Sequence, residues 1–202
     1  ESSLNADLII PVPDSGVPAA IGYAEEVKKN VELGIIRNHY VGRTFIEPTQ
    51  QIRSLGVKLK HSINKTLIKN KSLILIDDSL VRGTTSVKII KMLYEAGAKE
   101  IHMKIASPPI KYPDYYGVDT PNKKELLASN FDLEGMRKFI NATTIQFLSI
   151  DGLYKSMGFN KRNSSYPQFT DHCFTGDYPV KPLDALNENF QKSQISYISS
   201  KS

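Results

Sequence analysis

Residues 73–86, which read LILIDDSLVRGTTS, decide the fold of this chain. Four apolar residues lead into two adjacent acids, Asp77 and Asp78, and a turn with an arginine and a glycine then leads to three consecutive hydroxyl residues. A short continuous apolar run is typical of a strand that is buried on both faces. The pattern therefore predicts a buried strand with two carboxylates at its carboxyl end, followed by a phosphate-sized loop that opens a helix.

The segments on either side extend this reading to a strand–helix–strand unit. Apolar residues recur at helical spacing over residues 85–96, Gly97 stands where a left-handed cap belongs, and residues 100–106 read as the next strand. This order implies parallel strands joined by a right-handed crossover. Upstream, residues 8–13 read as a short strand and residues 17–29 as a helix. We therefore expect an α/β fold with a parallel central sheet flanked by helices.

The remaining segments carry weaker patterns. We expect a strand over residues 31–36 and another over 145–149, short helices over 123–129 and 133–140, and a last helix over 150–157.

The composition describes an ordinary globular protein and excludes several classes. The chain has 202 residues, 40% hydrophobic and 23% charged, with a net charge of +5. Lysine and glutamate are interleaved, which argues against a nucleic-acid partner, whereas a phosphorylated substrate would explain a positive site. No apolar run approaches the roughly 20 residues that span a bilayer, so we expect no membrane partner. The single cysteine, Cys173, allows no disulfide within the chain and reads as an inert thiol, so we expect a cytoplasmic location.

The two acids and the turn after them carry the chemistry. Ligands of open α/β sheets bind beyond the carboxyl ends of the strands. A carboxylate pair can accept hydrogen bonds from vicinal sugar hydroxyls, directly or through water on Mg²⁺. The turn can offer backbone N–H groups and hydroxyls to a phosphate, but it is neither a Walker A loop nor a G-x-G-x-x-G turn. The ordinary alternative for Asp77 and Asp78 is a solvated strand end that caps a helix through Ser79.

Two further segments could reach the same ligand. Ser15 follows another expected strand end, although alone it reads as a helix cap or turn residue. Residues 37–46 are basic and aromatic and show neither the helical nor the strand periodicity of apolar residues. They form either a solvated surface loop or a lid that brings Arg37, Tyr40 and Arg43 over a polyphosphate.

Taken together, these residues resemble a known family. Residues 73–85 are similar to the 5-phosphoribosyl-1-pyrophosphate (PRPP) motif of type I phosphoribosyltransferases, in which an apolar strand, two acids and a Gly-Thr-Thr loop follow one another. Five more segments, between about residues 4 and 180, resemble the amidophosphoribosyltransferases: 10–16, 37–46, 56–58, 107–113 and 174–179.

The resemblance implies a fold, a reaction and a set of site residues. The fold is that of type I phosphoribosyltransferases, and the enzyme is a Mg²⁺-dependent glycosyltransferase. Its reaction displaces pyrophosphate from the ribose of PRPP by ammonia and gives 5-phosphoribosylamine, the first committed step of purine biosynthesis. The implied metal-binding residues are Ser15, Asp77 and Asp78, and the implied catalytic residues are Asp77, Asp78, Arg37, Tyr40 and Arg43. The implied PRPP-binding residues are Asp77, Asp78, Ser79, Val81, Arg82, Gly83, Thr84, Thr85 and Ser86.

The resemblance also implies a domain division and partners. We expect a phosphoribosyltransferase domain over residues 4–158 and a C-terminal extension with a disordered tail over residues 159–202. The family takes ammonia from glutamine in an N-terminal domain whose nucleophile is a terminal cysteine, whereas this chain begins at Glu1. We therefore expect that domain to be missing and no glutaminase activity from this chain. Purine nucleotides are expected as feedback inhibitors, and other copies of the chain as partners in a homo-oligomer.

An iron–sulfur cluster is the one family cofactor that we do not expect. Many members hold the cluster through cysteines, but Asp114 and Thr170 stand where two of these are expected, and Cys173 alone remains.

Two other functions stay open. One is a salvage or pyrimidine phosphoribosyltransferase that uses a nucleobase, against which residues 107–113 and the long basic loop argue. The other is a non-catalytic phosphoribosyl fold that senses nucleotides, against which the intact carboxylate pair argues.

Overall fold

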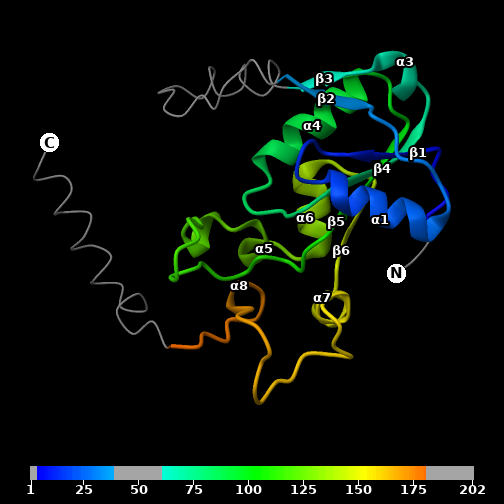
Figure 1. Cartoon of the computed structure of the whole chain (residues 1–202). Helices are drawn as coiled ribbons and strands as arrows, with labels where there is room; N and C mark the ends of the chain where they lie inside the picture. Colours follow the sequence, from blue (N-terminus) through cyan, green and yellow to red (C-terminus); the bar gives the residue numbers. More distant parts are fainter. Residues whose placement is uncertain (1–3, 39–60, 181–202) are drawn as a thin grey trace, which may run out of the picture.

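The computed structural model describes residues 4–38 and 61–180. Its centre is a four-stranded sheet with the order β1-β4-β5-β6, in which every neighbouring pair is parallel (Figure 1). The strands are β1 (Leu8–Pro11), β4 (Ser72–Asp77), β5 (Glu100–Ile105) and β6 (Thr144–Phe147). The predicted α/β class with a parallel sheet between helices is confirmed.

The middle of strand β4 is apolar because helices cover both of its faces. Leu73 and Leu75 pack in a core with α4 (Thr84–Glu95) and α6 (Leu133–Ile140), while Ile74 and Ile76 pack against α1 (Val17–Val27). Successive side chains of a strand point to opposite faces, so this division follows the alternation along the strand. All four residues are at most 2% exposed. The strand that carries the two acids is therefore the most firmly embedded segment of the sheet.

The other predicted helices lie close to their expected positions. Residues 123–129 form a 3₁₀ turn, η1 (Lys123–Glu125), and a short helix, α5 (Leu127–Asn130), and the last predicted helix is α7 (Ile150–Ser156). The sequence did not predict α3 (Lys65–Ile68) or α8 (His172–Thr175). Four residues make about one turn, which is too short to show a helical period.

The strand predicted over residues 31–36 is largely wrong. Val31 makes only an isolated bridge to Ile9, and the strand β2 comprises Ile35–Arg37. Strand β2 pairs antiparallel with β3 (His61–Ile63) in a second sheet, so Arg37, expected to open a loop, instead ends a strand. The rest of the predicted lid, residues 39–46, lies outside the described residues, as does the predicted C-terminal extension from residue 181 onward, which includes the predicted tail.

Ion pairs hold the last described segment together, and a hydrogen bond joins it to α7. The Arg162 guanidinium lies 2.5 Å from an Asp171 carboxylate oxygen and 2.7 Å from one of Asp177. The Tyr154 hydroxyl, on α7, donates a 2.9 Å hydrogen bond to Asp171. The chain after α7 thus returns to the body of the protein and forms α8 beside it (Figure 1).

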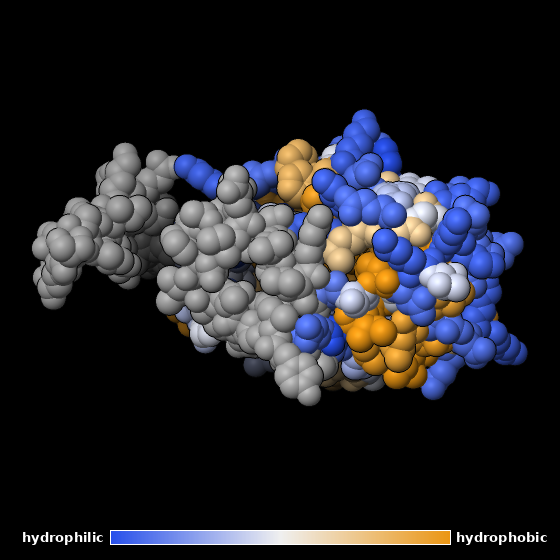
Figure 2. Space-filling model, turned by 90° about the horizontal axis from the view of Figure 1, so that it is seen from above, coloured by the Kyte–Doolittle hydropathy of each residue, from blue (hydrophilic) through white to orange (hydrophobic). Residues whose placement is uncertain are grey.

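Among residues 4–38 and 61–180, no helix combines the length and the apolar character needed to cross a bilayer. Figure 2 shows one face, on which hydrophilic side chains surround a smaller group of apolar ones.

Candidate functional site

A cleft of about 410 Å³ opens where β1 and β4 end. It brings together four segments that are far apart in the sequence: the turn after β1, the end of β2, the start of β3, and the stretch that follows β4. The predicted site residues that line it are Ser15, Arg37, Asp77, Asp78, Ser79, Val81, Arg82, Gly83, Thr84, Thr85 and Ser86. Tyr40 and Arg43 lie outside the described residues.

Asp77 is the buried member of the acid pair. It is the last residue of β4 and only 7% exposed. Burial, reinforced by the neighbouring charge of Asp78, raises the pKa of the Asp77 carboxyl to about 7. Near neutral pH this carboxyl group is therefore only partly ionised, unless a cation or hydrogen-bond donor stabilises its ionised form.

Asp78 and Ser79 turn the chain out of the sheet. The Asp78 backbone N–H donates to an Asp77 carboxylate oxygen at 3.0 Å, and the Ser79 N–H donates to Asp78 at 2.7 Å. The Ser79 hydroxyl lies 3.2 Å from the same Asp78 oxygen. Because Asp78 is exposed, its other carboxylate oxygen remains accessible from the cleft. The two acids thus present oxygens at different depths of one site.

The loop after the acids ends at the start of α4. Gly83 precedes that helix with a φ of +74°, and an added Cβ would lie 2.9 Å from the side chain of Leu127. Glycine is therefore required here by both conformation and space. Within the described chain no side chain caps this helix start, so the first-turn N–H groups face the cleft without a capping side chain. Together with the Thr84 and Thr85 hydroxyls, they offer hydrogen-bond donors and the positive end of the helix dipole, a combination suited to an anion.

The turn after β1 approaches the end of β4 closely. A Cβ on Gly16 would lie 2.4 Å from the Ile76 carbonyl oxygen, so only glycine lets this turn pass beside β4. The contact places Ser15 in the same cleft as the acid pair. Arg37 reaches the turn from β2, with its guanidinium 2.6 Å from the Asp14 carboxylate.

The structure adds residues that the sequence reading missed. His61 lines the cleft because β3 pairs it with Arg37 across the antiparallel ladder. Val12, Pro13 and Leu80 also line it. No local signal could identify His61, because its position depends on a partner strand across residues 39–60. Arg82 lines the cleft too, but its guanidinium also pairs with Glu125 at 2.8 Å.

The donor set of the cleft fits a hard divalent cation. Asp77 and Asp78 offer carboxylate oxygens and Ser15 offers a hydroxyl oxygen, whereas no thiol lines the cleft among the described residues. Oxygen ligands of this kind, completed by water and phosphate, are those that Mg²⁺ selects.

The sheet and its cleft define the chain as a protein of the type I phosphoribosyltransferase fold. Comparison with solved structures supports this class. A PRPP amidotransferase from B. subtilis, solved in complex with ADP and GMP, superimposes with a TM-score of 0.78 at 49% identity, over 90% of this chain and 40% of that one. Over the segment that it shares with them, the chain is a member of the amidophosphoribosyltransferase family.

The curated relatives give the extent of this match. The chain is 58% identical to the amidophosphoribosyltransferase of Rhizobium etli over 190 residues, which are 94% of this chain and 38% of the relative. It is 51% identical to the chloroplastic amidophosphoribosyltransferase 1 of Arabidopsis thaliana over 184 residues, 91% of this chain and 32% of the relative. The chain therefore spans about a third of the length of these relatives. No protein-family model matches it.

Proposed function

We propose that the chain transfers the phosphoribosyl group of PRPP to ammonia, giving 5-phosphoribosylamine in the first committed step of purine biosynthesis. One observation carries this proposal: a single cleft collects the acid pair and the helix-start loop, in a chain 58% identical to an amidophosphoribosyltransferase over 94% of its length. The domain that performs this step comprises residues 4–158 in our proposal, with residues 159–202 as an extension.

Different parts of the cleft would bind different groups of one ligand. The loop of residues 81–86 would bind the 5′-phosphate through backbone N–H groups, the hydroxyls of Thr84 and Thr85, and the helix dipole. Asp77 and Asp78 would accept hydrogen bonds from the ribose hydroxyls. Arg37 would stand near the pyrophosphate and neutralise part of its charge as it leaves, and Tyr40 and Arg43 would join it.

These residues would act by positioning and electrostatics rather than by forming a covalent bond. Departure of pyrophosphate leaves positive charge on the ribose ring, and the carboxylates of Asp77 and Asp78 would favour that charge in a site fixed in advance. A Mg²⁺ ion held by Ser15, Asp77 and Asp78 would supply further charge neutralisation to the pyrophosphate. Closure of residues 37–46 over the ligand would exclude water from the reactive carbon.

We propose that ammonia is produced by a part of the polypeptide outside the segment that this chain shares with its relatives. The relatives are named amidophosphoribosyltransferases and are more than twice as long as the match. We propose that glutamine serves this chain only through an N-terminal glutaminase domain. Purine nucleotides are proposed as inhibitors because the B. subtilis neighbour was solved with ADP and GMP. We also propose that the chain forms a homo-oligomer and acts in the cytoplasm.

The test is Mg²⁺-dependent pyrophosphate release from PRPP by the purified chain. We expect release with ammonium chloride and none above background with glutamine alone. Asp78→Asn should lose the activity, and Asp119→Asn, an exposed acid on the loop after β5, should keep it. Release only with a nucleobase would identify a salvage transferase instead. Purine nucleotide binding without any pyrophosphate release would identify a sensor.

A further inference from the structure

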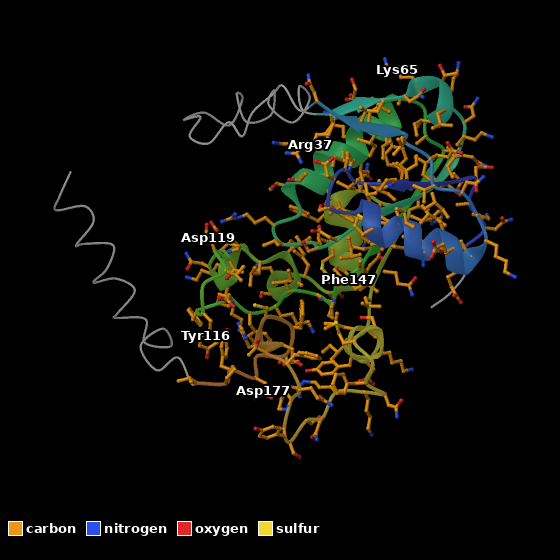
Figure 3. All side chains as sticks on the ribbon, viewed as in Figure 1. Arg37, Lys65, Tyr116, Asp119, Phe147 and Asp177 are labelled. Atoms are coloured by element: carbon orange, nitrogen blue, oxygen red, sulfur yellow. The ribbon has the colours of Figure 1, made fainter. Side chains whose placement is uncertain are left out.

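A second group of ligand-type side chains lies away from the cleft, where α8 meets the loop after β5. Asp114, His172 and Cys173 each direct one ligand atom to a common point, and these atoms all lie within 4.8 Å of one another. His172 Nε2 is 2.7 Å from an Asp114 carboxylate oxygen, and Cys173 Sγ is 3.9 Å from the same oxygen. Figure 3 shows the labelled Tyr116 and Asp177 near α8, far from Arg37 at the cleft.

The group is buried and already fixed in place. The Asp114 and His172 side chains are only 6% and 5% exposed. The second Asp114 oxygen accepts hydrogen bonds from the Tyr116 and Val118 N–H groups at 2.7 and 3.0 Å, which leaves the first oxygen facing His172. Outer hydrogen bonds of this kind orient carboxylate ligands in metal sites.

The backbone around the group holds the two segments together independently. The Cys173 carbonyl oxygen accepts hydrogen bonds from the Lys111 and Tyr112 N–H groups at 2.9 and 3.0 Å, and the Tyr178 hydroxyl donates to the Pro113 carbonyl oxygen at 2.7 Å. The three ligand atoms therefore stay close without relying on one another.

The His172 ring presents one nitrogen to the group. Its Nε2 faces Asp114, whereas its Nδ1 is buried without a hydrogen-bond partner among the described residues. The centroids of the Tyr116 and Tyr178 rings both lie 5.0 Å from the centroid of the His172 ring. The ligand atom of His172 in this group is therefore Nε2.

The donor types select the ligand. A thiolate, an imidazole and a carboxylate form a mixed set that suits Zn²⁺ and is too soft for Mg²⁺. Zinc bonds of about 2.0–2.3 Å place tetrahedral ligand atoms about 3–4 Å apart. The sulfur–oxygen separation of 3.9 Å lies within that range, and the nitrogen–oxygen separation of 2.7 Å is slightly shorter. An iron–sulfur cluster requires several cysteines, and the chain has one. We propose that Asp114, His172 and Cys173 bind one Zn²⁺ ion, with water in the fourth position, and so fasten α8 to the loop after β5.

Metal loading of the full chain tests this site without any activity assay. After dialysis against Zn²⁺ and removal of excess metal, elemental analysis should give about one ion per chain. Replacement by Co²⁺ should give a thiolate-to-cobalt charge-transfer band in the near ultraviolet. Cys173→Ser should abolish the band, and His172→Gln should weaken cobalt binding by roughly tenfold or more. Asp119→Asn, on the same loop but exposed, is the matched control and should change neither.

A second measurement needs no variant. Zn²⁺ should protect Cys173 of the unmodified chain from a thiol-alkylating reagent, and a chelator should restore the reaction. Equal alkylation with and without Zn²⁺ would overturn the proposal, as would a cobalt band that survives Cys173→Ser. Zinc uptake without protection would place the ion elsewhere on the chain and would equally overturn it.

Discussion

Replacing Asp77 with asparagine should make the fold more stable at alkaline pH, although it removes a carboxylate from the proposed site. The Asp77 side chain is buried, and burial together with the charge of Asp78 raises its pKa from 3.8 to about 7. Asparagine has nearly the same shape and keeps an oxygen that can accept the 3.0 Å hydrogen bond from the Asp78 N–H. The substitution therefore removes the charge and leaves the packing intact.

The sign and size of the effect follow from proton linkage. Between pH 3.8 and about 7, the folded chain keeps a proton on Asp77 that the unfolded chain has released. The free energy of unfolding therefore falls as the pH rises through this window. A rise of about three pKa units, at about 1.4 kcal/mol each, corresponds to roughly 4 kcal/mol by pH 8. Asp77→Asn has no carboxyl group to ionise at this position, so its free energy of unfolding does not fall for this reason.

Urea unfolding in the presence of a chelator, from pH 4 to pH 8, measures the difference directly. The variant and the parent should be about equally stable at pH 4, and the variant should be several kcal/mol more stable at pH 8. Asp78→Asn is the control, because asparagine keeps an oxygen for the Ser79 N–H and removes the charge that helps to raise the pKa of Asp77. It should give a smaller gain of the same sign. A stability difference that does not change with pH, or a variant less stable at pH 8, would refute the reasoning.

Four further substitutions test the site and other parts of the fold. Asp78→Asn should lower ammonia-dependent pyrophosphate release by tenfold or more, about 1.4 kcal/mol of transition-state stabilisation, and an unchanged rate in a folded variant would count against the assignment. Gly83→Ala should lower the free energy of unfolding by about 1–3 kcal/mol because the residue at this position has a positive φ. Gly22→Ala lies in a helix with open space around it and should raise the free energy of unfolding by about 0.5–1 kcal/mol. Effects of the same sign in the two variants would contradict this reasoning. Arg162→Met leaves the buried Asp171 carboxylate without its main partner and should lower the free energy of unfolding, measured with urea, by about 3–5 kcal/mol. A variant as stable as the parent would show that the pair contributes nothing to stability.

The sequence was most informative where structure and chemistry are both local. Strand β4 could be predicted because its burial on both faces leaves an unbroken apolar run, and the two acids follow it directly. The loop to α4 could be predicted because its glycine and hydroxyl residues are contiguous. The cleft now gathers these residues with Ser15 and Arg37. Their roles in binding and catalysis remain predictions until the variants are measured.

Features that depend on the meeting of distant segments could not be predicted in the same way. The pairing of β2 with β3 joins three-residue strands on either side of residues 39–60, which is too little pattern to reveal a partner. The group of Asp114, His172 and Cys173 joins residues 58 positions apart. The sequence showed only that two expected cysteines are absent, and the fold was needed to show what stands in their place.

The proposed PRPP site concentrates several features that oppose folding. Asp77 is an acid buried at the end of an apolar strand, Gly83 holds a left-handed conformation, and α4 begins without a side-chain cap. Each of them departs from a local rule of folding, and such departures are expected at functional sites. A single ligand that carries hydroxyls, phosphate and a bound cation would relieve the buried charge and satisfy the free N–H groups together. This agreement between what the fold lacks here and what PRPP would supply is the strongest physical reason to place PRPP in this cleft.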